Sequence, residues 1–420
     1  MAVRTGCKQT ETGVLPEDWE VDCLSRFWDI TDCKHVTARF VAAGYPIASI
    51  REVQSRFVDL ANAKQTTQHF YALLIEGGRR PKAGDLILSR NATVGEVAQV
   101  AEWHPLFAMG QDVCLLRKKA PEFSTNYLQA VFRSRVIANQ LSDLMVGSTF
   151  KRVNVEQIRA FVVPMPGPAE QEAIAEALSD ADALIESLER MVAKKRQIKH
   201  GAMRELLTGE RRLPGFSGQW EMGRLGDIGE VTGAGVDKKT RPGEMPVRLV
   251  NYLDVYRRDL LYSSGLTQIV SAKPEQVRRC AVRRGDVFFT PTSELPGDIA
   301  HSAVAMEDIP DGVYSYHLVR LRLRVDWDLT FRAYAFKTRA FYDAADSLCE
   351  GSGTRYVITL PRFRSMTVAV PPTASEQAAI ATVLSDMDAE ISALESKLAK
   401  ARQIKQAMMQ ELLTGRIRLV

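Results

Sequence analysis

Apolar residues recur at alternating spacings of four and three along two stretches of the chain, residues 170–209 and 376–415. The positions that define this seam are Ile174, Leu178, Ile185 and Leu188 in the first stretch and Ile380, Leu384, Ile391 and Leu394 in the second. Such a heptad seam favours a coiled coil over a helix lying on a broad sheet. We therefore predict two helices of roughly 60 Å each that pack as an antiparallel coiled coil. By itself, such a pair is architectural and carries no activity.

The two stretches are copies of one another. Aligned without gaps, they match at 25 of 40 positions, whereas chance would give about two or three, so the repeat is real. The start signals agree, because Gly167 and Pro168 suit N-cap and N1 positions, and Thr373 with Glu376 has capping-box spacing. Each stretch ends in Leu-Leu-Thr-Gly, with a glycine that can take the left-handed conformation closing a helix.

The segment before the first helix alternates short apolar runs with turns. Residues 86–88 and 96–100 read as two strands joined by the turn-like residues 91–95. We expect a helix over residues 123–144 and a last strand over residues 161–166, where prolines stop it.

Residues 211–372 repeat that plan with a different sequence. The short segments that correspond between the two parts of the chain are 15–19 with 213–220, 84–92 with 285–293, 147–151 with 351–355, and 161–166 with 367–372. The predicted domains are therefore 1–166 and 211–372, which we call head 1 and head 2, each followed by a spacer helix, 167–210 and 373–420. Arg418 follows the second helix at the position that Arg212 has after the first helix, where the chain enters head 2. We therefore expect the two ends of the chain to lie close together.

Composition narrows the class of protein without deciding it. The chain has 420 residues and a net charge of +4, which permits a nucleic-acid partner but does not demand one. There is no apolar leader and no run of about 18 apolar residues that could span a bilayer. Six scattered cysteines without a C-x-x-C pair favour a reducing compartment, so we expect a cytoplasmic protein with no membrane association.

Motifs for catalysis are missing from the sequence. There is no phosphate loop, dinucleotide fingerprint, H-E-x-x-H or G-x-S-x-G motif, and no Asn-Pro-Pro-aromatic or Asp-Pro-Pro-aromatic tetrapeptide. Six histidines lack metal-ligand spacing, and we expect them to be structural, including His317 in an expected strand over residues 314–318. The sequence predicts no metal and no cofactor.

Basic and amide side chains lie near the turns of both heads. Arginine and asparagine pair with guanine and adenine edges, and lysine and arginine neutralise phosphates. Most such residues are solvated surface, but Lys151 and Arg355 lie in turns that correspond between the heads. We expect these residues at or near DNA: Arg90, Asn91, Lys151, Arg152, Thr292, Ser293, Arg355 and Tyr356.

The order head, helix, head, helix resembles the specificity subunit of type I restriction-modification enzymes. The motifs that carry the resemblance are the E-Q-x-A-I-A start and R-Q-I-K to E-L-L-T-G end of each helix, and the Gly-Asp-Leu-Ile-Leu-Ser-Arg-Asn turn at residues 84–91. The resemblance covers essentially the whole chain. It implies that each head is a target recognition domain of α/β build. Each such domain would read one half of an asymmetric bipartite site in double-stranded DNA, with the helices setting the spacer.

The resemblance also implies a non-catalytic chain. Methylation would belong to modification subunits, and ATP-driven translocation and cleavage to a restriction subunit. Two other interpretations remain: a DNA-binding regulator that acts without methyltransferase subunits, and a coiled-coil scaffold that reads no DNA. A self-contained nuclease or methyltransferase is disfavoured by the missing motifs.

Overall fold

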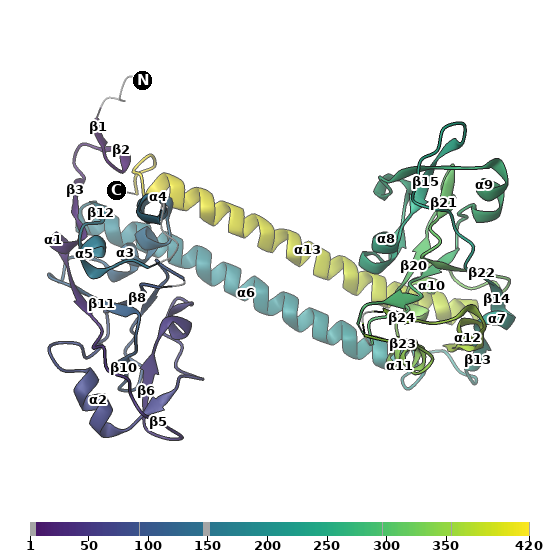
Figure 1. The fold of residues 1–420 in the computed structure, drawn as a ribbon, viewed down its shortest axis with the longest axis horizontal. Coiled ribbons are helices and arrows are strands. Elements are labelled where there is room, and N and C mark those ends of the chain that lie inside the picture. Colours follow the sequence, from purple (N-terminus) through teal and green to yellow (C-terminus); the bar gives the residue numbers. More distant parts are fainter. Residues whose placement is uncertain (1–5, 92, 146–151, 296, 354, 420) are drawn as a thin grey trace. The chain divides into compact units, whose positions relative to one another are not determined.

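The computed structural model describes residues 6–91, 93–145, 152–295, 297–353 and 355–419. The chain forms two compact units. Unit 1 joins Met1–Glu189 with Ser396–Val420, and unit 2 is Arg190–Glu395. Each unit therefore contains one head and a section of each long helix, which Figure 1 shows in teal and yellow.

The two long helices are α6 (Pro168–Leu206) and α13 (Ala374–Leu412). Gly209 and Gly415 follow them with φ of +76° and +64°, so both helices end in the left-handed conformation that the sequence predicts. A Cβ on Gly209 would also lie 3.1 Å from the Trp220 ring, and one on Gly415 would lie 2.3 Å from Pro16. Glycine is thus required at both ends for its backbone freedom and for its small size.

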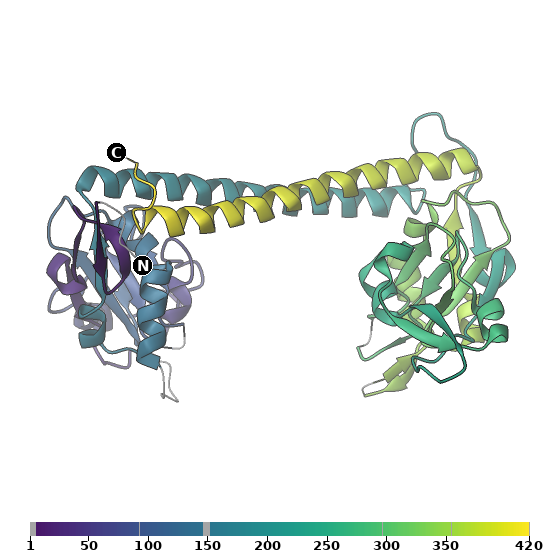
Figure 2. The ribbon, with the colours of Figure 1, turned by 90° about the horizontal axis from the view of Figure 1, so that it is seen from above.

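Within each unit the helix sections pack antiparallel, as Figure 2 lets the reader follow. In unit 1, Asp182 pairs with Lys405 and Glu189 pairs with Arg402. In unit 2, the residues 206 positions away form the same two pairs: Asp388 with Lys199, and Glu395 with Arg196. Because opposite charges at matched positions fix the register of two helices, the repeated ion pairs explain why these residues are identical in the two copies.

Head 1 is built from two four-stranded sheets and two strand pairs. The first sheet has the order β4 (Trp28–Asp32), β11 (Val113–Lys118), β8 (Leu86–Ser89), β9 (Val97–Gln99), and all its pairs are antiparallel. The second has the order β10 (Ala108–Met109), β6 (Tyr45–Ala48), β7 (Gln65–Thr66), β5 (Phe40–Val41). The strand pairs are β1 (Cys7–Thr10) with β2 (Gly13–Pro16) and β3 (Glu20–Cys23) with β12 (Val162–Met165). The helices are α1 (Leu24–Phe27), η1 (Ile50–Val53), α2 (Gln68–Leu74), α3 (Thr125–Phe132), α4 (Arg135–Met145) and α5 (Val155–Arg159).

The single helix expected over residues 123–144 is two helices, α3 and α4. Ser134 lies between them, donates its hydroxyl to the Val131 carbonyl and accepts the Val136 amide. Serine competes with the helical backbone in this way, so α3 ends and α4 begins around it. The two strands expected on either side of residues 91–95 are β8 and β9, with Leu86 opposite Gln99.

Head 2 repeats the core of this plan. Its largest sheet has the order β14 (Gly229–Thr232), β22 (Val319–Leu323), β18 (Val287–Phe289), β20 (Ser302–Ala305), β16 (Leu260–Leu261). Two further sheets are β17 (Ile269–Ala272), β15 (Met245–Val250), β21 (Gly312–Tyr314), and β19 (Thr292–Ser293), β24 (Arg355–Val357), β23 (Glu350–Ser352), and β13 (Glu221–Arg224) pairs with β25 (Thr367–Val370). The helices are α7 (Leu225–Ile228), α8 (Tyr252–Arg257), η2 (Ser263–Gly265), α9 (Pro274–Cys280), α10 (Arg332–Ala335), α11 (Arg339–Ser347) and α12 (Leu360–Ser365).

Both heads use the long helices as part of their cores. In unit 1, Ile174 and Leu178 of α6 pack with Leu412 and Leu413 from the end of α13 in the core cluster around Trp19. In unit 2, the corresponding residues of the other helix, Ile380 and Leu384, pack with Leu206 and Leu207. Of the eight predicted seam positions, seven are buried and Ile185 is half-buried. Since burying one such side chain contributes about 1.5–3 kcal/mol, each helix start is firmly attached to its head.

The Glu-Gln dipeptide that opens each helix copy fixes the helix to its head. The Gln171 side chain accepts the Ser124 amide at 2.9 Å and donates to the Pro166 carbonyl at 2.8 Å. In unit 2, Gln377 likewise accepts the Asp328 amide at 2.9 Å and donates to the Pro371 carbonyl. The identity of this residue in both copies therefore reflects a shared role, although the accepting proline lies five residues before Gln171 and six residues before Gln377.

Only half of the expected capping box at Thr373 is formed. The Thr373 hydroxyl accepts the Glu376 amide at 3.3 Å, as expected. The Glu376 carboxylate, however, is 1% exposed. It accepts hydrogen bonds from Nε and Nη2 of Arg212 instead of from the Thr373 amide. An ionised guanidinium is the stronger partner for a buried carboxylate, so it replaces the backbone contact.

Candidate nucleic-acid interface

In unit 1 the turn after β8 lies beside the segment that precedes α5. Asn91 forms an antiparallel bridge with Arg152, and the Val153 amide donates to the Arg90 carbonyl at 2.9 Å. The sequence predicted DNA contacts for residues 90–91 and for residue 152 independently, and the fold places these two stretches side by side. Arg152 is exposed and lies 3.6 Å from the Asp112 carboxylate. The fourth predicted residue of head 1, Lys151, lies outside the described residues.

Arg90 does not reach the surface of the head. Its side chain is 3% exposed, and Nη2 lies 2.6 Å from Asp32 Oδ1 and 3.8 Å from Cys33 Sγ. Burial and the negative charge of Asp32 raise the pKa of the Cys33 thiol. Asp32, Cys33 and His35 have their ligand atoms within 4.8 Å of one another, but the Arg90 guanidinium already supplies the positive charge at this cluster. We therefore assign Arg90 to the support of the turn and leave it out of the DNA-facing set.

In unit 2 the predicted residues also come together. Thr292 and Ser293 form β19, which pairs with β24 so that Ser293 lies opposite Tyr356. Ser293 is buried, and its hydroxyl accepts the Leu295 amide, so its side chain serves the turn. Thr292 and Tyr356 are half-buried, and Arg355 is exposed at the end of β24.

The register corrects one correspondence between the heads. The Val153 amide donates to the Arg90 carbonyl, and the Ile358 amide donates to the Pro291 carbonyl, both at 2.9 Å. Asn91 opposite Arg152 therefore corresponds to Thr292 opposite Val357. Counting back along the chain, Tyr356 and not Arg355 has the position of Lys151. The sequence comparison paired Arg355 with Lys151 because it aligned Gly351 with Gly147. Head 2 has one residue more between that glycine and the paired position, Val357, than head 1 has before Arg152.

Each head also contains a pocket where two parallel strands end. In head 1, β6 and β10 are parallel, and the Gly110 amide donates to the Ala48 carbonyl at 2.7 Å just beyond them. In head 2, β15 and β21 are parallel, and the Ser315 amide donates to the Val250 carbonyl at 2.9 Å. The carboxyl ends of parallel strands are the places where α/β proteins most often hold ligands.

A capped turn follows the first strand of each parallel pair. The Ser49 amide donates to the Glu52 carboxylate at 2.8 Å, and the Asn251 amide donates to the Asp254 carboxylate at 2.9 Å. Both turns are capping boxes, which hold one wall of each pocket rigid. The two pockets are therefore counterparts built on the same backbone.

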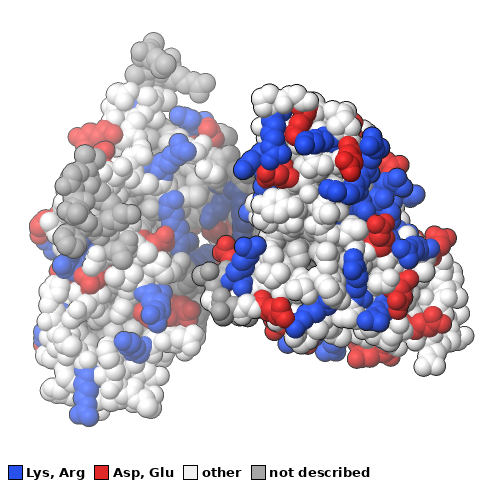
Figure 3. All heavy atoms as spheres, turned by 45° about the vertical axis from the view of Figure 1, so that its right-hand side comes forward, with Lys and Arg blue, Asp and Glu red and all other residues white. Residues whose placement is uncertain are grey.

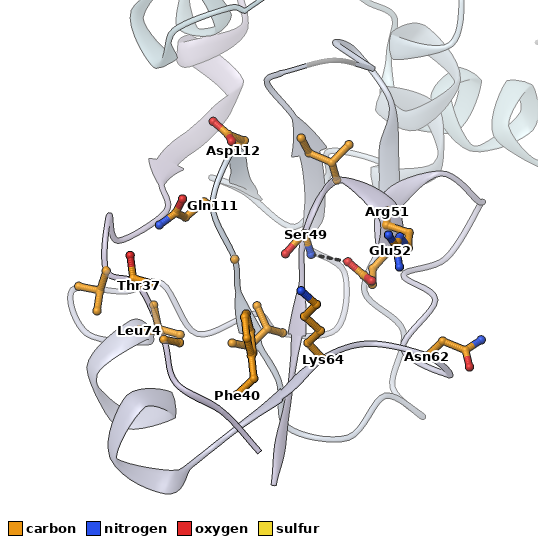
Figure 4. Close-up of a pocket in the computed structure, with 15 residues that line it drawn as sticks. Thr37, Phe40, Ser49, Arg51, Glu52, Asn62, Lys64, Leu74, Gln111 and Asp112 are labelled. Carbon is orange, nitrogen blue, oxygen red and sulfur yellow. Dashed lines mark hydrogen bonds between the residues drawn. The ribbon is translucent and has the colours of Figure 1, made fainter. Parts of the chain in front are cut away.

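The pocket of head 1 has a volume of about 440 Å³. Figure 4 shows its lining, with Gln111 and Asp112 carried by the segment after β10 and Phe40 by β5. The Lys64 ammonium lies over the Phe40 ring at 4.7 Å. The pocket thus combines an apolar floor with amide, hydroxyl and charged groups, a combination typical of sites that bind by shape and a few polar contacts.

The pocket of head 2 has a volume of about 580 Å³ and includes Thr292, Ser293 and Arg355 in its lining. The Tyr252 hydroxyl donates to the Thr292 carbonyl at 2.9 Å, which ties the capped turn to β19. His317 lies in the loop between β21 and β22, not in a strand as expected, and its ring lies 3.9 Å from that of Tyr316. Burial, assisted by the positive charges of Lys238 and Arg355, lowers the pKa of His317.

Charge is mixed over the surface of the heads. Figure 3 shows lysine and arginine side chains interspersed with acidic ones on the face of unit 2 that it brings forward. The net charge of +4 agrees with this picture.

Part of the pocket lining was missed by sequence reasoning. Gln111 and His317, which line the pockets, and Tyr316, whose ring lies beside that of His317, are in segments without a repeated motif. A signal did exist, because Ser49-x-x-Glu52 and Asn251-x-x-Asp254 each follow an apolar strand with capping-box spacing. What the sequence could not give is the parallel pairing of β6 with β10 and of β15 with β21.

The comparisons with known proteins agree with the geometry. The model of the type I restriction modification DNA specificity domain matches residues 16–200 and again residues 217–404. The putative type I restriction enzyme MjaX specificity subunit of Methanocaldococcus jannaschii is 24% identical, over 98% of this chain and 96% of its own length. No helix among the described residues is long and apolar enough to cross a membrane.

Solved structures of the same kind share the fold. The HsdS subunit of Thermoanaerobacter tengcongensis is similar over 96% of this chain and 98% of its own, with 17% identity and a TM-score of 0.50. The S subunit of the type I restriction-modification system of M. genitalium is similar over 98% of both chains, with 12% identity and a TM-score of 0.57. With the specificity domain matched twice over most of its length, the chain belongs to the family of type I restriction-modification DNA specificity subunits.

Proposed function

We propose that each head of this specificity subunit reads one half of an asymmetric bipartite site in double-stranded DNA, and that α6 and α13 set the spacer between the halves. One observation carries the proposal. The two heads are attached to the long helices by corresponding contacts, but the side chains in their corresponding turns and pockets differ. Two heads that share a plan but differ at these positions suit two different half-sites, whereas two identical readers would suit a palindrome.

The DNA-facing residues of the proposal are those whose side chains are at least partly exposed at the paired turns. They are Asn91 and Arg152 in head 1 and Thr292, Arg355 and Tyr356 in head 2. Lys151 stays a prediction, and Arg90 and Ser293 act as supports behind the turns. Arginine and asparagine suit base edges or phosphates, and a tyrosine ring suits contact with sugar or base.

Catalysis in this proposal belongs to partner subunits. A modification subunit would methylate adenine, and a restriction subunit would use ATP to translocate and cleave DNA. The buried aspartates directly before β8 and β18 have a structural role in both heads. Asp85 binds Arg117 and Asp286 binds Arg322 through two nitrogens each, and both aspartates also accept a backbone amide. These carboxylates hold the strands together and have no free oxygen for acid-base chemistry.

The test is methylation mapping of DNA from cells that express this chain with its methyltransferase, against cells that lack only this chain. We expect an asymmetric bipartite motif that appears only when the chain is present. An unchanged pattern with an active methyltransferase would contradict the proposal. It would favour a regulator that binds DNA alone, or a scaffold without sequence preference.

A further inference from the structure

We infer that two corresponding residue pairs determine which bases each head accepts. Each pair lies one residue beyond the second strand of a parallel pair: Gln111-Asp112 beyond β10 in head 1 and Tyr316-His317 beyond β21 in head 2. The inference rests on the proposed function and adds the subsite that does the reading. It concerns the pockets, which lie beside the turns already described. Gln111 is the member of this set for which the chemistry of the side chain points to one particular base.

The two residue pairs occupy corresponding places. Gly110 and Ser315 make the same backbone contact to the end of the neighbouring parallel strand, so the residues that follow them are counterparts. Their positions are set by strands buried on both sides, since Ala108 and Val313 are fully buried. A side chain on such an element is placed more precisely than one on a free loop. The places are the same and the side chains differ, which is what two different half-sites require.

Both pockets are continuous with the DNA-facing turns. In head 1, Asp112 lines the pocket and lies 3.6 Å from Arg152, which bridges Asn91. In head 2, one pocket is lined by His317 together with Thr292 and Arg355. A duplex held at the turns would therefore present its base edges to these pockets.

Gln111 has its hydrogen-bonding groups available. The side chain is exposed, and no hydrogen bond or ion pair of its amide occurs within the described part of the chain. Asp112, in contrast, is engaged with Arg152, and the Arg90 amide donates to its carbonyl at 2.8 Å. A glutamine amide offers one donor and one acceptor side by side, which matches N7 and N6 of adenine in the major groove. We therefore assign an adenine, other than the methylated base, to the part of the half-site that head 1 reads through Gln111.

Head 2 offers different chemistry at the same place. Tyr316 is half exposed, and its ring lies against that of His317. His317 lines the pocket together with Lys238 and Arg355, which supply two cationic donors. No glutamine or asparagine amide occupies the positions of Gln111 and Asp112 here. The adenine preference assigned to Gln111 is accordingly confined to one half of the site.

The experiment compares methylation motifs for the full complex carrying Gln111→Ala, Gln111→Glu or the matched control Gln68→Ala. Gln68 is also exposed in head 1 but lies on α2 and does not line the pocket. We expect Gln111→Ala to lower the preference for adenine at one position of one half-site by about 5- to 150-fold. Gln111→Glu should shift that position toward cytosine, because a carboxylate accepts from the cytosine amino group. Gln68→Ala should leave the motif unchanged.

Other outcomes would overturn the inference while leaving the proposed function intact. These are an unchanged motif for both Gln111 variants, an equal loss at all sites, or a change in the other half-site. Failure of the unaltered chain to produce any bipartite motif would instead sink the proposed function. Because the Gln111 amide holds no structural contact within the described residues, a melting temperature equal to that of the unaltered chain is expected for both variants, which keeps the readout on recognition.

Discussion

Arg418 donates hydrogen bonds to both carboxylate oxygens of Glu170, at 2.5 and 2.8 Å, and so joins the segment after α13 to the start of α6. Glu170 is 3% exposed and also accepts the Trp19 indole at 2.9 Å. In unit 2, Arg212 binds Glu376 in the same way beside Trp220. The segment after α13 therefore contacts head 1 in the same way as the segment after α6 contacts head 2. The contact of Arg418 with Asp18 confirms the expectation that the described ends of the chain lie close together.

Replacing Arg418 by alanine should destabilise unit 1, because the buried Glu170 would lose its charged partner. Arg418 is one-third exposed, so solvent offsets part of the loss and we expect about 1–3 kcal/mol in the free energy of unfolding. Denaturant unfolding followed by tryptophan fluorescence measures it. The control is Arg416→Ala, whose side chain is 64% exposed and makes only a 3.4 Å contact with Glu411. Equal losses for the two variants would argue against a special role of Arg418.

Removing Arg355 should reveal whether it contacts phosphate or base. If Arg355 neutralises a phosphate, Arg355→Ala weakens binding to all sequences and lowers the slope of log affinity against log salt by about one charge. If it contacts a base edge, the loss is about 1–3 kcal/mol and concentrates at one position of the site. Affinities of the full complex for the mapped duplex at several salt concentrations distinguish the two. Arg339→Ala, 88% exposed in the same head, is the control that should change neither quantity.

DNA binding should strengthen as the pH falls through the histidine range. In the free protein the pKa of His317 is lowered by burial and by the charges of Lys238 and Arg355. Phosphates placed near this pocket would offset those charges and raise the pKa, so the complex would bind a proton that the free protein does not. Affinity therefore rises as the pH falls from above the pKa of His317 in the complex to below its lowered pKa in the free protein. His317→Gln should flatten this dependence and His69→Gln should not; equal slopes in both would place the DNA away from His317.

Lengthening both spacer helices by four residues should lengthen the spacer of the recognised site. Insertions after Glu189 in α6 and after Glu395 in α13 leave the ion pairs within each unit matched. Each adds about 6 Å, nearly two base-pair steps. We expect a methylation motif with a longer spacer and both half-sites intact. A four-residue insertion after Gly243, in a loop of head 2, should leave the spacer alone; altered half-site bases with an unchanged spacer would contradict the role of the helices.

The sequence predicted the framework well because the framework is repeated. Identical residues such as Gln171 and Gln377 attach each helix to its head in a similar way, so alignment of the chain with itself found the helices, their ends and the order of the heads. Competition between side chains and the backbone for the same hydrogen bonds was harder to predict from the sequence. One helix was expected where Ser134 separates two, and a capping box was expected where Arg212 takes the carboxylate of Glu376.

The candidate site was predicted less completely, because charge alone does not say which way a side chain points. Arg90 and Arg355 look alike in sequence, yet the first is buried against Asp32 and the second is exposed. The pockets depend on parallel pairs between strands some 60 residues apart, such as Ile47 with Ala108, and no local pattern announces such pairs. Gln111 and His317 therefore became visible only in the fold.

The central claim is that each head reads its own half-site, and replacing head 2 by a second copy of head 1 tests it most directly. The variant chain carries the corresponding head 1 sequence in place of residues 211–372 and keeps α6 and α13, whose Glu-Gln contacts accept either head in the same way. Methylation mapping should then give a motif whose two halves carry the same bases, with the original spacer. A motif that keeps the original second half-site, although head 2 is gone, would contradict the account.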